Sequence, residues 1–173
     1  MAMSDKTLWM MSGIPGCGKS HVAKNELMHG SGWRYISRDE IRLNYLDEND
    51  EHFAHEGAVY DEFIYRIREA LNAEGVFDVI ADATHLNWAS RRKLLTALGR
   101  EIDLTKINIV AVVVKSDYRT CLMRNKKRTG RACVPEKIIN DMHKHYRHPR
   151  NDPFNYNGIL EWDNETEDWS DAS

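Results

Sequence analysis

The sequence predicts an α/β fold in which helices sandwich a parallel sheet of four to five strands. Short, nearly continuous apolar runs at residues 8–12, 33–37, 76–81 and 107–115 are typical of strands buried on both faces of a parallel sheet. Helical stretches lie between these runs, and strands that alternate with helices form sheets with right-handed crossover connections. The third observation is a glycine-rich loop that joins the first run to a helix.

This loop occupies residues 13–20 and reads Gly13-Ile14-Pro15-Gly16-Cys17-Gly18-Lys19-Ser20. It matches the phosphate-binding pattern G-x-x-x-x-G-K-[ST] without a mismatch. The glycines let the backbone turn tightly and aim its N–H groups at an anion, which the helix dipole also attracts. Lys19 can follow the β- and γ-phosphates, and Ser20 can offer its hydroxyl to Mg²⁺. The loop therefore predicts a P-loop NTPase fold, with a chance glycine turn as the alternative.

The remaining elements follow in chain order. Helices are expected at residues 22–28, 51–74, 87–99 and 117–127, and a further helix begins at Pro135, because proline fits a first helical turn best. Gly75 ends the longest helix, and Asn87 and Asp117 are expected as helix caps. A last strand is expected at residues 158–162, at the edge of the sheet.

The chain has 173 residues, of which 42% are apolar and 29% charged, and this suits one globular domain with a full hydrophobic core. Its formal charge of −3 is unevenly distributed. Residues 151–173 contain seven acids and no Lys or Arg, so residues 1–150 carry +4. We therefore expect a single P-loop domain over residues 1–162 and a solvated, frayed acidic tail over residues 163–173.

Several classes of protein are disfavoured. The longest apolar run, residues 109–114, is too short to cross a bilayer, and the N-terminus lacks the pattern of a signal peptide. Three cysteines without C-x-x-C spacing favour a reduced, cytoplasmic protein. The Asn125-Lys126 pair lacks the acid of a guanine-reading N-K-x-D motif. We expect a cytoplasmic protein without a membrane partner, and not a GTPase.

A candidate catalytic base follows the second expected strand. Asp39 lies where a parallel sheet opens its carboxyl end to ligands, and it can accept the proton of an attacking hydroxyl. Arg38 is adjacent to it, and Arg42 lies one helical turn later, where it could hold a substrate phosphate. The alternative is that Asp39 caps a helix and both arginines are solvated.

A second acid and a basic lid complete the candidate site. Asp82 ends the apolar strand before Thr84, as an acid that orients Mg²⁺ or its waters does, although both residues could instead cap a loop. Residues 119–131 contain six Lys or Arg and no acid. We expect residues 124–135 to form a helical lid, on which Arg124 and Arg128 neutralise charge on the phosphoryl group.

The chain resembles the kinase domain of the phage-type polynucleotide 5′-hydroxyl kinases and their P-loop relatives. The resemblance covers residues 7–147 and is carried by four segments in the same order: G-I-P-G-C-G-K-S, Y-I-S-R-D-E-I-R, D-A-T-H-L-N-W-A-S-R-R and R-N-K-K-R-T-G-R-A-C-V-P. The chain departs from the family pattern at Ala83, which is inserted into the family's D-T-N, and at His21, where many relatives have Thr. A phage-encoded cytoplasmic enzyme is compatible with this resemblance.

By this resemblance, Lys19 and Ser20 bind ATP and Mg²⁺, and Asp39 is the general base. The resemblance also implies that Arg42 contacts the 3′-phosphate of the acceptor and that Arg128 contacts the donor phosphates. The residues expected to contact ATP are Gly13, Gly16, Cys17, Gly18, Lys19, Ser20, His21, Arg124 and Arg128, and those expected at the acceptor are Arg38, Arg42 and Thr84.

Together these features predict a kinase that transfers the γ-phosphate of ATP to a hydroxyl, with Lys19, Asp39 and Arg128 as catalytic residues. Ser20 is expected to bind Mg²⁺, and Asp82 is expected to bind it through water. The favoured acceptor is the 5′-OH of a DNA or RNA end or of a nucleotide, because the modest basic charge suits a single strand. The alternatives are a hydroxyl on a modified base in DNA, a small metabolite, and a nucleotide-binding switch without transfer activity. The oligomeric state is left open.

Overall fold

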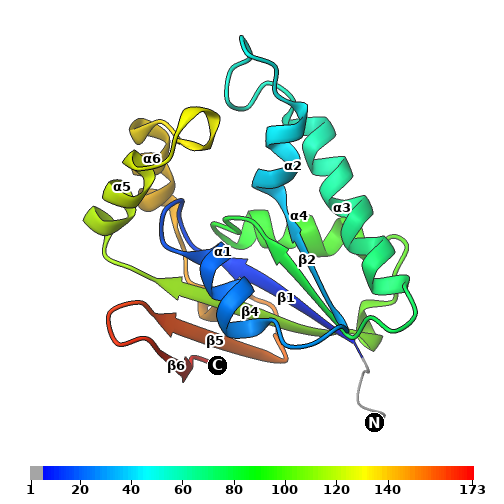
Figure 1. The fold of residues 1–173 in the computed structure, drawn as a ribbon. Helices are drawn as coiled ribbons and strands as arrows, with labels where there is room; N and C mark the ends of the chain where they lie inside the picture. The colour runs from blue at the N-terminus through cyan, green and yellow to red at the C-terminus, as the bar shows by residue number, and fades with distance from the viewer. Residues whose placement is uncertain (1–5) are drawn as a thin grey trace.

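A computed structural model describes residues 6–173 and centres on a six-stranded sheet with the strand order β2-β3-β1-β4-β5-β6 (Figure 1). The strands are β1 (Thr7–Ser12), β2 (Trp33–Ser37), β3 (Asp78–Asp82), β4 (Asn108–Lys115), β5 (Gly158–Asp163) and β6 (Asp168–Asp171). The first five strands are parallel, and β6 pairs antiparallel with β5. The predicted α/β class is confirmed, but the sheet has one strand more than expected.

The helices are α1 (Lys19–Val22), α2 (Arg38–Tyr45), α3 (Glu56–Asn72), α4 (Trp88–Leu98), α5 (Tyr118–Lys126) and α6 (Glu136–His145). A π-helical turn at Ala23–Leu27 extends α1, and 3₁₀ turns lie at Leu104–Lys106, Gly130–Ala132 and Pro149–Asn151. Asn87 and Asp117 cap α4 and α5 as expected, since their side chains accept from backbone N–H groups. The longest helix begins at Glu56 rather than at residue 51, which leaves Phe53 in the preceding turns.

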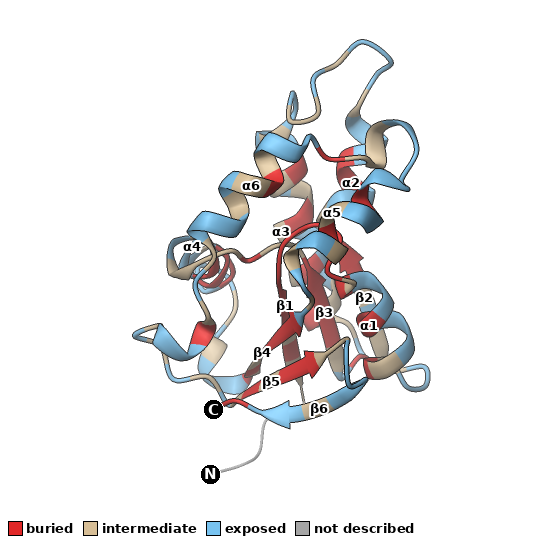
Figure 2. Cartoon of the chain, turned by 90° about the vertical axis from the view of Figure 1, so that its left-hand side faces the viewer, coloured by how far each residue is buried: buried red, intermediate tan, exposed pale blue. Residues whose placement is uncertain are grey.

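Two layers of helices cover the two faces of the sheet. On one face, α2, α3 and α4 pack through Ile41, Phe63 and Leu94 against strand residues that include Leu8. On the other face, α1, α5 and α6 pack against residues that include Met11. Leu8 and Met11 face opposite ways because side chains alternate along a strand. Figure 2 shows the inner strands largely buried, as the near-continuous apolar runs predicted.

The register of the parallel strands brings their carboxyl ends together. Asp82 at the end of β3 is level with Met11 of β1 and with Ser37 of β2. The loop after β1 and the start of α2 therefore lie at the same edge as Asp82. In Figure 1 the α2–α3 pair and the α5–α6 pair rise on opposite sides of this edge.

The expectation of a frayed tail at residues 163–173 is wrong. Residues Asp168–Asp171 form β6, so β5 is an inner strand rather than the predicted edge strand. Trp169 packs edge-to-face on Trp162 with ring centroids 5.1 Å apart, and Ala172 is buried. The acidic composition suggested solvation, but a few apolar side chains and the free edge of β5 are enough to order this segment.

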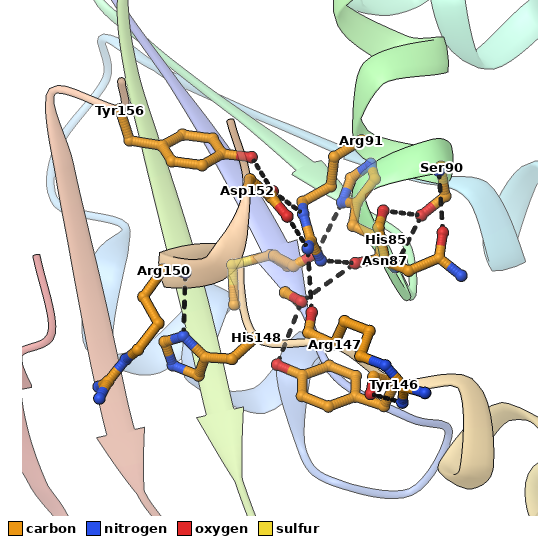
Figure 3. Close-up of polar contacts among 12 residues, drawn as sticks. His85, Asn87, Ser90, Arg91, Tyr146, Arg147, His148, Arg150, Asp152 and Tyr156 are labelled. Carbon is orange, nitrogen blue, oxygen red and sulfur yellow. Dashed lines mark hydrogen bonds and ion pairs between the residues drawn. The ribbon is translucent and has the colours of Figure 1, made fainter. Parts of the chain in front are cut away.

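A buried arginine on α4 joins three segments behind this edge of the sheet (Figure 3). The Arg91 side chain is fully buried and forms two hydrogen bonds to the Asp152 carboxylate, at 2.6 and 2.7 Å. It also donates to the carbonyl oxygens of His85, at 2.6 Å, and Arg147, at 2.9 Å. Tyr156 donates to the same Asp152 carboxylate. Arg91 therefore ties the loop after β3 to the segment that leads into β5.

His85 lies inside this network. Its Nδ1 is 2.6 Å from the carbonyl oxygen of Met11, to which it donates, and its own carbonyl also accepts from Ser12 Oγ. The backbone φ of His85 is +37°, a conformation that L residues rarely adopt, so these contacts hold a strained loop in place. Burial lowers the pKa of the His85 imidazole to about 4, and the ring is neutral at pH 7.

We predict that acidification destabilises the protein through His85. The unfolded chain binds a proton near the ordinary pKa of about 6.5, whereas the folded chain binds one only near pH 4. The stabilisation is therefore complete above pH 6.5 and is lost as the pH falls, by about 2 kcal/mol between pH 7 and pH 5. Urea unfolding at the two pH values measures the loss, and His85→Gln should show a smaller one. An equal loss in both proteins would contradict the assignment.

Candidate active site

Residues 13–18 form a tight loop between β1 and α1, and Lys19 and Ser20 open α1, as the motif predicted. The backbone of Gly16 has a φ of +84°, and a Cβ there would lie 2.2 Å from the carbonyl oxygen of Cys121. Gly18 has a φ of +99° at the N-cap of α1. Both positions therefore require glycine. Cys17 is buried, and its N–H donates to the carbonyl of Ile14 across the turn.

Lys19 folds back over this loop. Its Nζ donates to the carbonyl oxygen of Ile14 at 3.0 Å and lies 3.8 Å from Cys17 Sγ, and the residue is only 9% exposed. A phosphate held in the loop would offer this ammonium a charged partner in place of a neutral carbonyl. His21, the next residue but one, is exposed and lies 3.1 Å from the Asn25 side-chain amide.

Ser20 and Asp82 meet at the carboxyl end of β3. Ser20 Oγ donates to Asp82 Oδ2 at 2.6 Å, and the Tyr35 hydroxyl donates to the same oxygen at 2.6 Å. Burial raises the pKa of Asp82, although Lys19 and the two hydroxyl donors oppose the shift. Burial and the neighbouring Asp82 carboxylate together raise the pKa of Tyr35. The alternative of loop capping does not describe Asp82, because its partners are these two side chains.

This pair fits the donor set that Mg²⁺ prefers. Hydroxyl and carboxylate oxygens are hard ligands, and Mg²⁺ usually takes one or two of them with waters and substrate phosphates. Ser20 is exposed at the loop while Asp82 is buried behind it, which suits an ion held in front of Asp82. Among residues 6–173, no group of three or more His, Cys, Asp or Glu has the geometry of an all-protein metal site.

Asp39 is not the cap of α2. Ser37 occupies that position, and its Oγ accepts from the N–H of Glu40 at 3.2 Å. The Asp39 side chain is 66% exposed and forms an ion pair with the guanidinium of Arg42. This frees the Asp39 carboxylate from a capping role and leaves it accessible at the edge of the sheet.

Glu56 is a site residue that the sequence analysis missed. It is the first residue of α3, and its carboxylate accepts from Arg38 at 2.6 Å and from both Nε and Nη2 of Arg42. Burial acts to raise the pKa of Glu56, but the two guanidinium groups outweigh it and lower that pKa. Burial alone would lower the pKa of Arg42, but Glu56 and Asp39 outweigh it and raise that pKa. Only the packing of α3 beside α2 reveals this partner.

A cavity of about 220 Å³ opens beside Asp39, and we call it the acceptor cavity after the role expected of Arg38, Arg42 and Thr84. Thr84 and Arg38 line it, so the structure brings these two predicted acceptor residues together with Asp39 and Arg42. Arg42 is buried beneath Phe53, with its guanidinium 5.0 Å from the ring centroid. The full lining consists of Pro15, Arg38, Asp39, Arg42, His52, Phe53, Glu56, Ala83, Thr84, Val134 and Met142.

The predicted lid reaches this cavity through Val134, which lines it. Arg128 lines a small hollow together with Asp39 and Arg42. Arg131 donates to the carbonyl oxygens of Asp47 and Asp50 in the connection between α2 and α3. The lid is therefore in contact with the connection between α2 and α3. Arg124 lies instead beside the P-loop, where its Nη1 would be 3.5 Å from a Cβ on Gly18.

Asn164 also reaches the P-loop, from the turn between β5 and β6. Its side-chain amide donates to the carbonyl oxygens of Cys17, at 2.9 Å, and Lys115, at 2.6 Å. Together with Arg124, it flanks Gly18. The sequence carried no signal for this contact, because Asn164 is 147 residues from Cys17 and lies in the segment expected to be a solvated tail.

The fold and the site define a P-loop nucleotide-binding domain with a kinase-like architecture. The chain belongs to the family described as an AAA domain, which it matches over residues 8–149. A comparison with curated proteins found no match. None of the helices in residues 6–173 is long and apolar enough to span a membrane.

Solved structures of kinases share this fold. The chain is similar to a chain of the Pnkp1/Rnl/Hen1 RNA repair complex, with a TM-score of 0.64 and 21% identity over 81% of this chain and 43% of that one. It is similar to a fungal RNA kinase, with a TM-score of 0.61 and 15% identity over 91% of this chain and 73% of that one. It is also similar to a gluconokinase from Sinorhizobium meliloti 1021, with a TM-score of 0.55 and 17% identity over 91% of this chain and 83% of that one. The predicted resemblance to polynucleotide-kinase-like P-loop domains is confirmed at the level of the fold.

We predict that Asn164→Ala weakens nucleotide binding without unfolding the protein. The change removes two hydrogen bonds, one of them to the P-loop, so the Kd of magnesium ATP should rise about three- to tenfold. Isothermal titration measures the Kd, and thermal unfolding checks the fold. Thr166→Ala, an exposed change in the same turn, is the matched control. A Kd that is the same in Asn164→Ala and in the control would contradict the contact.

Proposed function

We propose that the protein is a hydroxyl kinase that transfers the γ-phosphate of ATP to the 5′-OH of a nucleic-acid end. The observation that carries the proposal is the position of Asp39, an exposed carboxylate that lines a cavity shared with Pro15 of the P-loop. A nucleotide-binding switch would need no base at this place. Family membership and the kinase-fold neighbours support phosphotransfer, and the cavity supports a hydroxyl acceptor.

In the proposed reaction, Asp39 accepts the proton of the acceptor hydroxyl as that oxygen bonds to the γ-phosphorus. The bond between this phosphorus and the β–γ bridging oxygen breaks, and ADP leaves. Arg42 holds Asp39 in place through their ion pair. Lys19 and Arg128 stabilise the charge that develops on the phosphoryl oxygens. Ser20 and Asp82 would hold Mg²⁺, which would neutralise phosphate charge and orient the γ-phosphate.

The chemistry of the acceptor cavity supports a nucleotide. Arginine forks suit a phosphate, and Arg38 and Arg42 both line the cavity close to Asp39. Phe53 and His52 pack edge-to-face with centroids 4.5 Å apart and offer an aromatic wall for a base or sugar. Arg42 is already satisfied by two carboxylates, whereas Arg38 is 27% exposed. We therefore assign the acceptor phosphate chiefly to Arg38 rather than to Arg42, to which the resemblance gave it, and we assign to Arg42 the orientation of Asp39. The RNA kinase fold of a neighbour is consistent with this acceptor.

We predict that Asp39→Asn lowers turnover by about two to four decades, because it removes the proton acceptor at nearly constant shape. The Kd of ATP should change little. Glu40→Gln is the matched control, since Glu40 is an adjacent exposed carboxylate that pairs with Lys24. Steady-state kinetics with labelled ATP measure turnover. Near-normal turnover in Asp39→Asn would remove Asp39 from the base role.

We also predict the order of acceptors in a panel tested with labelled ATP. A 5′-hydroxyl oligonucleotide and a nucleoside 3′-monophosphate should be phosphorylated, and a free nucleoside should be about one to two decades poorer, because it lacks the phosphate for Arg38. Gluconate and a 5′-phosphorylated oligonucleotide with hydroxymethyl bases are the competing acceptors. Preference for either of them would keep the kinase chemistry and overturn the nucleic-acid acceptor.

A further inference from the structure

A second and larger hollow lies between α3 and α4, and we call it the α3–α4 groove. Its volume is about 800 Å³. Three of its basic residues lie along one side of the groove, because Arg92, Lys93 and Arg100 come from α4 and the turn after it. The full lining consists of Arg38, Glu56, Gly57, Tyr60, Asp61, Ala89, Arg92, Lys93, Thr96, Ala97 and Arg100.

The groove carries an excess of positive charge. It contains four cations and two acids, and one of these acids, Glu56, is already paired with Arg38 and Arg42. Within residues 6–173, Arg92, Lys93 and Arg100 take part in none of the ion pairs. All three are exposed. Cations that line a groove without carboxylate partners are suited to an anionic ligand.

A small hollow shares lining residues with both the groove and the acceptor cavity, and we call it the passage. Its volume is about 60 Å³, and it shares Thr84 with the acceptor cavity and Lys93 with the groove. Arg38 lines all three spaces. The basic surface therefore begins at the residue that we assign to the acceptor phosphate and continues along α4.

The Arg38 side chain has one hydrogen-bond donor that none of the described residues accepts. Its Nη2 binds Glu56, but its Nε is buried and has no hydrogen-bond partner among the described residues. Its guanidinium lies 5.3 Å from the ring centroid of Tyr60, and Lys93 Nζ lies 4.1 Å from the same ring. The Tyr60 ring thus contacts two cations that both line the passage. A buried guanidinium donor without a partner is costly, so a shift of the Arg38 side chain that let an oxyanion reach Nε would be favourable.

We propose that the α3–α4 groove binds the phosphodiester backbone of a single-stranded nucleic acid on the 3′ side of the acceptor nucleotide. This inference rests on the proposed function and extends it from a single nucleotide to a polynucleotide. The 5′-OH lies at Asp39, the first phosphate lies at Arg38, and the following phosphates lie along Arg92 and Arg100. An acceptor the size of gluconate would leave this basic groove without a ligand.

The test compares a 5′-hydroxyl tetranucleotide, as matched RNA and DNA, with a nucleoside 3′-monophosphate. The Arg92→Ala/Arg100→Ala double variant should lower kcat/KM for the tetranucleotide about tenfold relative to the monophosphate, with the loss in KM rather than kcat. The slope of log Kd against log salt for the labelled tetranucleotide should become shallower by about 0.7 for each phosphate that the variant no longer binds. Arg34→Ala/Arg66→Ala is the control, because it removes the same charge at exposed positions outside the groove.

The outcomes separate the groove from the proposed function. Equal kcat/KM for the tetranucleotide and the monophosphate, or a groove variant that behaves like the control, overturns the groove and leaves the kinase assignment intact. Displacement of the labelled tetranucleotide by an equally charged acidic peptide at the same concentration would also overturn a phosphodiester site. If no nucleotide is phosphorylated, the proposed function fails. The Kd of the labelled tetranucleotide, measured by anisotropy, then tests the groove independently of catalysis. An unchanged Kd in the groove variant overturns the groove proposal.

Discussion

The buried guanidinium of Arg91 is the constraint on which the P-loop edge of the sheet depends. It holds the carbonyl of His85, and His85 in turn donates to Met11 of β1, just before the P-loop. The same loop contains Thr84, whose carbonyl accepts from the N–H of Gly13. The P-loop and the residues after Asp82 are therefore fixed relative to each other by one charged side chain inside the protein (Figure 3).

The Arg91–Asp152 pair illustrates how a buried ion pair specifies a fold. Such a pair adds little net stability over a well-packed apolar pair, but removal of one partner typically costs about 3–5 kcal/mol, since the other charge is left buried. The guanidinium here also satisfies two carbonyl groups that no secondary structure pairs. Alternative arrangements of the loop after β3 are thus strongly disfavoured, and the strained backbone of His85 persists.

The α2–α3 side of the site depends on a different balance of charge. The carboxylate of Glu56 forms ion pairs with Arg38 and Arg42, and Arg42 in turn restrains Asp39 through a second ion pair. A base needs a fixed position, and a phosphate needs cations that are not fully neutralised. For the proposed function, the unequal sharing meets both needs, because Arg42 is buried against carboxylates whereas Arg38 retains an Nε that has no hydrogen-bond partner among the described residues.

The sequence by itself determined the α/β class, the parallel strands and the P-loop with Lys19 and Ser20, and it favoured Asp82 as an acid near Mg²⁺ over a loop-capping role. These features depend on local chemistry: apolar runs of strand length, glycines at positive φ, and an acid at a strand end. Tertiary structure alone decided the roles of Glu56, Arg91 and Asn164, because each acts on residues distant in the chain that only packing brings within hydrogen-bond reach. It also decided that the acidic C-terminal segment forms a strand, since the open edge of β5 that it pairs with does not exist until the sheet has formed.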